Sequence, residues 1–338
     1  MAQEGPDPKD DHPQYLDPSE LGTKEYWETY YKRSLEYLSS KKTDAILLTT
    51  ATENPSDNDN DDEVRGDDDD DIGTSWFSEH QAARKVLKFL TSRSFPLSPR
   101  NTSSAQTTIL DLGTGNGGML ALLRRKGGFS GDMVGVDYSA QSVQLARELQ
   151  RLKVSTGYAT DKEYDSDDSE GDQDEEGEGD GGEAEQRDIR FEEWDVLDPV
   201  NEDALAQRGG KRISWFPYDR NGFDIVLDKG TFDAVSLSDE TIAEETSTSN
   251  KDDSEKSDRN GKIVQQRICH KYPLMAAKLV RPGGFLVVTS CNWTEEELVR
   301  WFLATGDLRV WGRVDYPQFG FGGYQGQGVY TVCFERKS

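Results

Sequence analysis

The chain has 338 residues, of which 33 % are hydrophobic and 31 % charged, and its formal net charge is −26. This length can bury one large core or two smaller ones, and no apolar run approaches the ~18 residues that a membrane-spanning helix needs. No cluster of Lys and Arg of the kind that holds a phosphate backbone is present, so we expect neither a membrane nor a nucleic-acid partner.

The acidity is concentrated in three segments, at about 52–72, 155–188 and 239–261. Together they carry more negative charge than the whole chain, so the remainder is close to neutral. We interpret them as disordered inserts in surface connections, the alternative being docking arms for a basic partner. The Pro- and Asp-rich residues 1–25 are expected to be disordered as well, which leaves residues 26–338 as a single domain.

Two helices are expected before the first strand. Apolar residues recur at spacings of three and four over residues 26–38, which predicts a short amphipathic helix. A second helix follows Trp76 and Phe77, with Ser78 as its N-cap and an apolar face that ends at Leu90.

From residue 107 the pattern alternates between short apolar runs and longer amphipathic ones, as in β-α units around a parallel sheet. The predicted strands cover residues 108–112, 132–137, 189–194, 223–228 and 285–290. The predicted helices cover residues 117–126, 140–153, a segment after Lys262 that reaches Val280, and residues 295–305, with Thr294 as the cap of the last. Residues 308–314 and 329–335 are expected to form a closing antiparallel pair.

The most specific feature is a glycine-rich turn between the first strand and the next helix, in the sequence ILDLGTGNGG over residues 109–118. Glycine permits a tight turn and a close approach of a ligand to the backbone, while the N-terminus of the helix presents free N–H donors. Asp137 ends the next strand, 24 residues after Gly113, where a carboxylate can accept both hydroxyls of a ribose.

Two ligand classes fit this turn. Gly113, Gly115 and Gly118 satisfy the G-x-G-x-x-G pattern of dinucleotide-binding proteins, which leaves an NAD-dependent oxidoreductase as an alternative. Asp111, two residues before the first glycine, would repel a pyrophosphate and attract a cation. S-adenosylmethionine carries a sulfonium and an amino group and no phosphate, so acids at Asp111 and Asp137 match its charges better.

These motifs resemble those of class I S-adenosylmethionine-dependent methyltransferases. The resemblance is carried by residues 111–117, Asp137, Asp195 and the VRPGG turn at 280–284. More narrowly, four motifs resemble the protein-lysine methyltransferases that act on translation elongation factor 1-alpha: WFSE at 76–79, LDKGTFDA at 227–234, TSCNWTEEEL at 289–298 and FGFGG at 319–323. The resemblance covers about residues 26–334, excluding the acidic inserts. It therefore implies no role for these inserts.

The resemblance implies a Rossmann-like, seven-stranded, mostly parallel sheet with helices on both faces and an antiparallel C-terminal strand pair. It implies S-adenosylmethionine as cofactor and translation elongation factor 1-alpha as protein substrate. The cofactor-binding residues that it indicates are Asp111, Gly113, Thr114, Gly115, Asn116, Gly117, Asp137, Tyr138, Asp195 and Val196.

The substrate lysine must be neutral to attack the methyl group, because its amine has a pKa of about 10.4 in water. An apolar slot with aromatic walls would favour the neutral form. Motif position suggests Trp76, Phe77, Phe232 and Trp293 as these walls, although each could instead belong to the core. Asp228 or Asn292 would supply an oxygen that orients the amine.

Other features exclude further activities. Asp228 is followed by Lys-Gly-Thr rather than by the Pro-Pro-aromatic motif of nucleic-acid amino methyltransferases, so a base substrate is not expected. The three cysteines are isolated and the three histidines unclustered, which indicates no disulfide framework, no metal site and a reducing compartment. We expect a monomer in the cytoplasm, with the nucleus as a second location; a non-catalytic adaptor with acidic docking arms is the remaining alternative.

Overall fold

The computed structural model describes residues 13–51, 80–102, 107–152, 188–242, 266–317, 319–321 and 324–338. The chain divides into two compact units. One unit is Glu28–Trp194, and the other combines Met1–Trp27 with Asp195–Ser338. Trp76 and Phe77, and most of the three acidic segments, lie outside the described residues.

The unit Glu28–Trp194 contains three parallel strands. Its elements are α1 (Lys24–Ala51, beginning in the other unit), α2 (Ala82–Thr91), β1 (Ile109–Leu112), α3 (Gly118–Arg125), β2 (Met133–Asp137), α4 (Ala140–Leu152) and β3 (Arg190–Glu193). β2 pairs with β1 on one side and β3 on the other, and Asp111 lies opposite Gly135 in the register. All residues of β1 and β2 are buried, as expected of strands covered on both faces.

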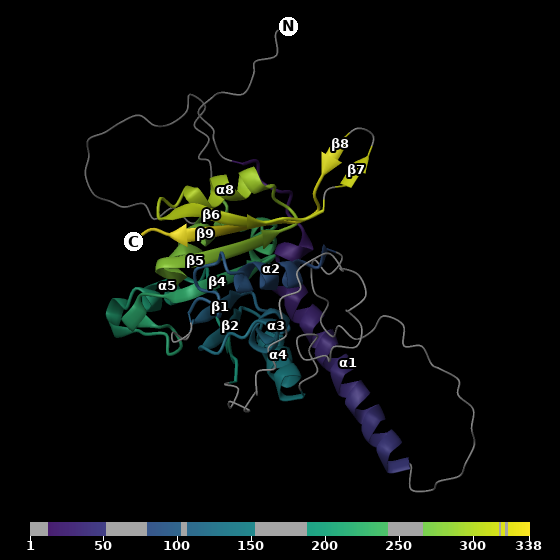
Figure 1. Ribbon diagram of the computed structural model, residues 1–338. Coiled ribbons are helices and arrows are strands. Elements are labelled where there is room, and N and C mark those ends of the chain that lie inside the picture. The colour runs from purple at the N-terminus through teal and green to yellow at the C-terminus, as the bar shows by residue number, and fades with distance from the viewer. Residues whose placement is uncertain are drawn as a thin grey trace. The chain divides into compact units, whose positions relative to one another are not determined.

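The second unit holds the remaining strands. Its elements are η1 (Glu20–Gly22), α5 (Pro199–Leu205), η3 (Arg208–Gly210), η4 (Tyr218–Arg220), β4 (Phe223–Lys229), α6 (Thr231–Ser236), η5 (Ile268–His270), α7 (Lys271–Leu279), β5 (Val280–Ser290), α8 (Glu295–Leu303), β6 (Leu308–Val314), β7 (Phe319–Phe321), β8 (Tyr324–Gly326) and β9 (Tyr330–Arg336). β4 and β5 are parallel, whereas β9 is antiparallel to both β5 and β6 (Figure 1).

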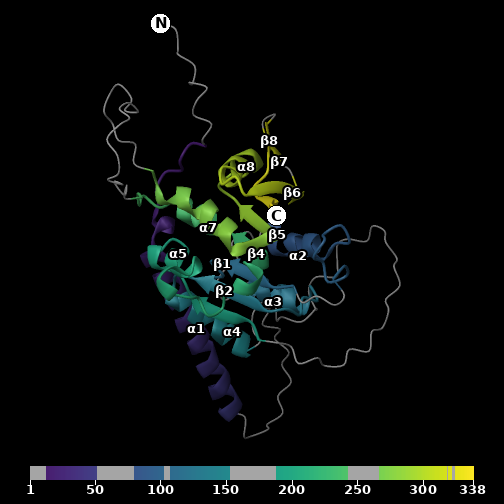
Figure 2. The same cartoon turned by 90° about the vertical axis from the view of Figure 1, so that its left-hand side faces the viewer.

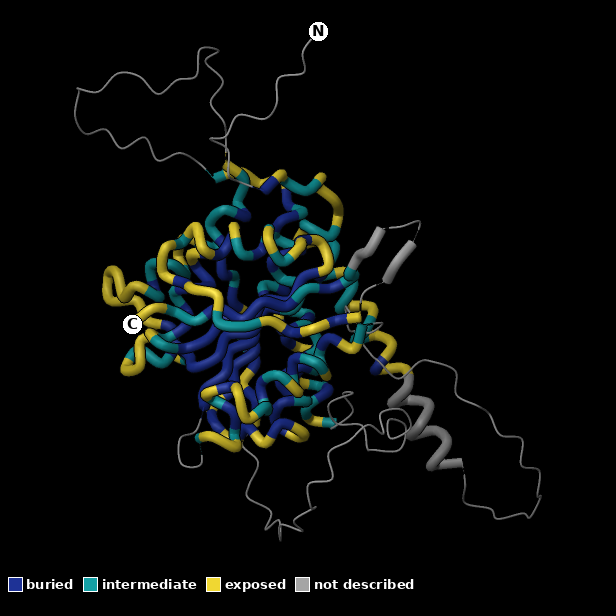
Figure 3. Tube along the Cα trace, turned by 45° about the horizontal axis from the view of Figure 1, so that its top comes forward, coloured by how far each residue is buried: buried dark blue, intermediate teal, exposed yellow. Residues whose placement is uncertain are grey.

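The strand order of the main sheet is β3-β2-β1-β4-β5-β9-β6, with β7 and β8 as a separate ribbon. This confirms the predicted fold, a mostly parallel seven-stranded sheet with an antiparallel C-terminal pair. The last strand in the chain, β9, lies between β5 and β6 and is therefore not at the edge of the sheet. In Figure 3 the buried residues follow the strands and the exposed ones the outer helices and loops.

The first helix is longer than the apolar pattern predicts. α1 begins at Lys24 and continues to Ala51, beyond the predicted end at residue 38. Figures 1 and 2 show it running beside α4. Leu38 of α1 packs there against Leu145 and Leu149 of α4 in a buried cluster, so tertiary contact supports the helix as well as its own periodicity.

Residues 13–22 are part of the second unit rather than a free N-terminal tail. The Arg267 guanidinium donates to the carbonyl oxygen of Leu16 at 2.5 Å and to that of Ser236 at 2.9 Å. The backbone N–H of Ser19 also donates to the Leu237 carbonyl at 3.1 Å. These bonds explain why order begins earlier than composition suggests.

Local capping fixes the helices near the strand ends. Thr294 and Glu297 form a capping box at the start of α8, as predicted for Thr294. The short helices α5 and α6 were not predicted; Asp198 caps the first of them through the backbone N–H of Val200. In the part of the chain that the structure describes, no helix combines the length and apolar character required to cross a membrane.

Candidate functional site

The glycine-rich turn leads from β1 into α3, as predicted. Gly113, Gly115 and Gly117 have φ of 61°, 57° and 76°, a region that glycine adopts far more readily than other residues. The backbone N–H of Thr114 donates to the Val136 carbonyl at 2.9 Å, which ties the turn to the neighbouring strand β2. The backbone conformation therefore favours glycine at these three positions.

Packing adds a second requirement at two of these positions. A Cβ on Gly117 would lie 2.6 Å from the Phe191 ring, and a Cβ on Gly115 would lie 3.0 Å from the hydroxyl of Tyr31. Gly117 thus allows close packing inside the unit, whereas Gly115 faces a polar side chain of α1.

Two buried carboxylates border the turn. Asp111 is 3 % exposed and accepts a hydrogen bond from Thr114 Oγ1 at 2.9 Å, while Asp137 is 4 % exposed. The N–H of Gly115 donates to Asp137 Oδ2 at 3.1 Å, so the two acids bond to consecutive residues of one turn. The structure brings together the carboxylates that the sequence places at the ends of adjacent strands.

Two serines that the sequence interpretation missed hold the second of these acids. The N–H of Ser139 donates to Asp137 Oδ1 at 3.0 Å, and Ser142 Oγ donates to Oδ2 at 2.8 Å. Burial raises the pKa of the Asp137 carboxyl, and the hydrogen bonds from Ser139, Ser142 and Gly115 oppose that shift. The sequence YSAQS after β2 contained this signal, since Ser and Thr in a strand-to-helix turn commonly donate or cap.

Two other predicted cofactor-binding residues, Asn116 and Tyr138, lie close to these acids in the chain. Asn116 Oδ1 accepts from the N–H of Gly118 at 3.0 Å, so this amide caps the start of α3. Tyr138, directly after β2, is partly exposed beside the buried Asp137.

This group of residues fits S-adenosylmethionine. Gly117 leaves no room for a Cβ, the backbone is exposed at Gly113, and both carboxylates are held in place by hydrogen bonds. Their negative charge would favour a cationic ligand over a pyrophosphate. Asp111, Thr114, Gly115 and Asp137 are the residues that would hold the ligand.

Asp195 and Val196, predicted to contact the adenine, belong to the second unit. Asp195 is partly exposed; its Oδ1 accepts from the N–H of Leu197 at 2.8 Å, and its carbonyl accepts from Asn201 Nδ2 at 2.9 Å. Val196 is buried. The side chain of Asp195 thus stabilises a turn through Oδ1, and Oδ2 does not take part in that hydrogen bond.

Asp228, at the end of β4, is 1 % exposed and acts as a cap for α6. Its Oδ1 accepts from the N–H groups of Thr231 at 2.9 Å and Phe232 at 3.2 Å, and its Oδ2 accepts from the Tyr272 hydroxyl at 2.8 Å. Burial raises the pKa of the Asp228 carboxyl to about 7, against the lowering effect of the Tyr272 hydrogen bond. This geometry makes Asp228 a support for the strand end; the predicted role in orienting an amine remains a prediction.

Phe232 and Trp293 lie in an aromatic cluster of the second unit. They are 1 % and 2 % exposed, and their ring centroids are 6.0 Å apart in a stacked arrangement. Tyr272 and Trp301 also contact the Phe232 ring. Burial therefore gives both residues a core position, which was the alternative to a role in walling a substrate slot.

Asn292 is exposed just after the end of β5. The turn that contains it is held by Ser290 and Asp233, which the sequence analysis did not single out. Ser290 Oγ donates to Asp233 Oδ1 at 2.5 Å and accepts from the N–H of Asn292 at 3.1 Å. The N–H of Cys291 donates to Asp233 Oδ2 at 2.9 Å. Because Asp233 is buried and supported in this way, the turn is fixed while the amide of Asn292 remains accessible.

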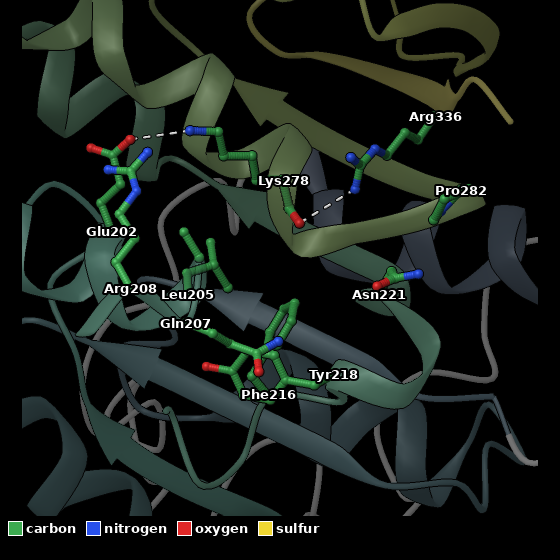
Figure 4. A pocket seen from close by; sticks show the side chains of 11 residues that line it. Glu202, Leu205, Gln207, Arg208, Phe216, Tyr218, Asn221, Lys278, Pro282 and Arg336 are labelled. Carbon is green, nitrogen blue, oxygen red and sulfur yellow. Dashed lines mark hydrogen bonds and ion pairs between the residues drawn. The ribbon is translucent and has the colours of Figure 1, made fainter. Parts of the chain in front are cut away.

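A cavity of about 480 Å³ opens elsewhere in the second unit (Figure 4). It is lined by residues of α5, η4, α7 and the start of β5, among them Tyr218, Asn221 and Pro282. Lys278 and Glu202 at its rim form an ion pair at 3.1 Å. None of the predicted site residues that the structure describes lines this cavity. Asn221 and Pro282 place it towards the amino ends of β4 and β5, whereas Asp228 and Asn292 lie at the carboxyl ends.

The chain is similar in sequence to known methyltransferases. A family model described as a methyltransferase domain matches residues 103–164, which include the glycine-rich turn and Asp137. Protein-lysine N-methyltransferase EFM4 of Saccharomyces cerevisiae is 28 % identical over 96 % of this chain and 97 % of its own. EEF1A lysine methyltransferase 2 is 27 % identical in Danio rerio, over 94 % of this chain and 89 % of its own, and 24 % identical in Homo sapiens, over 94 % and 88 %.

The chain is a class I S-adenosylmethionine-dependent methyltransferase related to these proteins, and S-adenosylmethionine is its cofactor. The predicted sheet and cofactor are confirmed.

Proposed function

We propose that this enzyme transfers a methyl group from S-adenosylmethionine to the side-chain amine of a lysine in translation elongation factor 1-alpha. The observation that carries the methyl-donor half of the proposal is the pair of buried carboxylates, Asp111 and Asp137, fixed on one glycine-rich turn. The protein substrate is supported by the near full-length similarity to relatives named as lysine methyltransferases, two of which name EEF1A.

The residues around the turn bind and orient the cofactor. Asp137 accepts the ribose hydroxyls, while Asp111 and the Gly113 to Gly117 backbone hold the methionine part. Asp195 contacts the adenine amino group, with Val196 beside it. The cofactor supplies an electrophilic methyl group on a sulfonium.

On the substrate side, the enzyme must align a neutral amine ~3 to 3.5 Å from the methyl carbon, in line with the bond that breaks. The lysine amine would lose its extra proton to solvent before it attacks the methyl group that the bound cofactor would supply. Asn292 is accessible and can orient the amine through its amide oxygen, and Asp228 holds the adjoining strand end. Trp76 and Phe77 remain candidates for the apolar walls of the slot.

The proposal is tested with purified protein, labelled S-adenosylmethionine and recombinant translation elongation factor 1-alpha, with mass spectrometry to locate methylated lysines. We expect methylation by the wild type. Asp137→Asn should weaken cofactor binding about 10- to 150-fold, the range for losing hydrogen bonds to a charged group. Glu148→Gln is a matched control, because it removes one carboxylate from the same unit at a partly exposed position on α4.

Three outcomes would contradict the proposal. Binding of NAD without binding of S-adenosylmethionine, measured by calorimetry, would indicate an oxidoreductase. Binding of the factor without release of S-adenosylhomocysteine would indicate an adaptor. Methylation of other proteins in a cell extract, but not of this factor, would support methyl transfer and refute the proposed substrate.

Size-exclusion chromatography and cell fractionation test the expected monomer and its cytoplasmic location.

A further inference from the structure

Helix α1 is held against the turn that follows β2 and against α4. Glu28 Oε1 accepts from the N–H of Ala140 at 3.1 Å, at the start of α4. One turn further along α1, Tyr31 packs with Leu35 and Leu38 on the buried leucines of α4. A polar contact and an apolar cluster thus hold one face of α1 in a defined position beside the turn after β2.

This position places the hydroxyl of Tyr31 at the glycine-rich turn. The hydroxyl oxygen lies 3.0 Å from the point where a Cβ on Gly115 would be. Burial raises the pKa of this hydroxyl well above the ordinary tyrosine value, and the negative charges of Asp137 and Asp111 add to that shift. The phenol therefore stays protonated throughout the neutral range and can donate a hydrogen bond.

The chemistry of the ligand shows what this donor can serve. The methionine part of S-adenosylmethionine carries an amino group and a carboxylate. Asp111 and Asp137 can accept from cationic or hydroxyl groups, but they repel a carboxylate. A neutral O–H donor beside Gly115, where the methionine part is proposed to lie, supplies the complementary interaction.

We propose that Tyr31 is a further cofactor-binding residue, whose hydroxyl donates a hydrogen bond to the carboxylate of the methionine part of S-adenosylmethionine. This inference rests on the proposed cofactor site. It assigns α1 a direct role in the site: its leucines dock on α4 so that one tyrosine reaches the glycine-rich turn.

A packing role alone would need only the ring. The ring of Tyr31 belongs to the apolar cluster with Leu35 and Leu38, where phenylalanine would pack equally well. The hydroxyl extends from this cluster to Gly115. Tyr31→Phe therefore separates the two roles, since it keeps the ring and removes the donor.

The test measures binding to the purified apoprotein by calorimetry, with two ligands that differ only in the carboxylate: S-adenosylmethionine and decarboxylated S-adenosylmethionine. Tyr31→Phe should weaken binding of the first about 10-fold or more, as for a hydrogen bond to a charged group, and leave binding of the second within about twofold. Tyr30→Phe, the same change one residue earlier on α1, is the matched control and should alter neither. Thermal unfolding of both variants checks that the fold is retained.

The outcomes separate this inference from the proposed function. If the wild type binds both ligands and Tyr31→Phe changes neither affinity, the role of Tyr31 is wrong and the cofactor assignment stands. If the variant loses equal affinity for both ligands, the hydroxyl acts on the adenosine or the amino group, which also overturns the inference. If the wild type binds neither ligand, the proposed function itself fails.

Discussion

Asp228 offers a test of how burial controls an acid at a strand end. Its carboxyl is 1 % exposed and accepts from Thr231, Phe232 and Tyr272, and its pKa is raised from 3.8 to about 7. The folded protein therefore binds this proton more tightly than the unfolded chain does. The free energy of unfolding should decrease as the pH rises from about 4 to 7, because the buried carboxyl has to lose its proton.

The size of the effect follows from the two pKa values. A difference of about 3 units corresponds to ~4 kcal/mol between the fully protonated and fully ionised limits. Between pH 5.5 and pH 8 the expected part of this change is ~2 kcal/mol. Asp228→Asn cannot ionise, yet it keeps an oxygen to accept from the α6 backbone, so it should lack this contribution.

The measurement is urea unfolding of the wild type and Asp228→Asn at pH 5.5 and pH 8. The stability of the variant relative to the wild type should increase by ~2 kcal/mol towards the higher pH. Asp219→Asn, an exposed carboxylate of the same unit, controls for the loss of one negative charge. If the wild type and Asp228→Asn keep a constant difference across this range, the carboxyl titrates normally and the account of its burial is wrong.

Two further substitutions test the packing described above. Gly117→Ala introduces a Cβ 2.6 Å from the Phe191 ring, whereas Gly209 has a similar positive φ and no atom within 4 Å of its Cβ position. By urea unfolding, Gly117→Ala should lower the free energy of unfolding by about 1 kcal/mol or more beyond the loss in Gly209→Ala. Equal losses in the two variants would contradict the packing role. Arg267→Leu removes the donor to Leu16 and should cost ~1–3 kcal/mol and speed proteolytic cleavage within residues 13–22; an unchanged cleavage rate would show that this segment is held by other contacts.

The cofactor half of the site was predictable because its information is local. The turn between β1 and α3 and the acid at the end of β2 are each encoded by a short run of residues, and parallel pairing of the two strands brings them together. The antiparallel pairing of β6 and β9 was predictable from two apolar runs, but the insertion of β9 beside β5 was not, since both orders satisfy the same pattern.

The substrate half depends on tertiary contacts that the sequence does not display. Phe232 and Trp293 have the composition of slot walls and of core residues alike, and only their burial distinguishes the two. Asp228 has the position of a ligand-binding acid, yet Tyr272, from a distant part of the chain, occupies one of its oxygens. Tyr31 lies within the helix predicted over residues 26–38, and nothing in its neighbourhood along the chain indicates the contact with Gly115.

The outermost strand of the second unit has a consequence for how this protein behaves at high concentration. Among the residues that the structure describes, β6 pairs with β9 alone, so its other side carries unpaired backbone groups of the kind that recruit strands from other molecules and begin aggregation. Arg309 and Arg313 project from this strand and form ion pairs with Glu335 and Glu295. A strand from another molecule would have to accommodate these charged side chains, so they disfavour edge-to-edge association at β6.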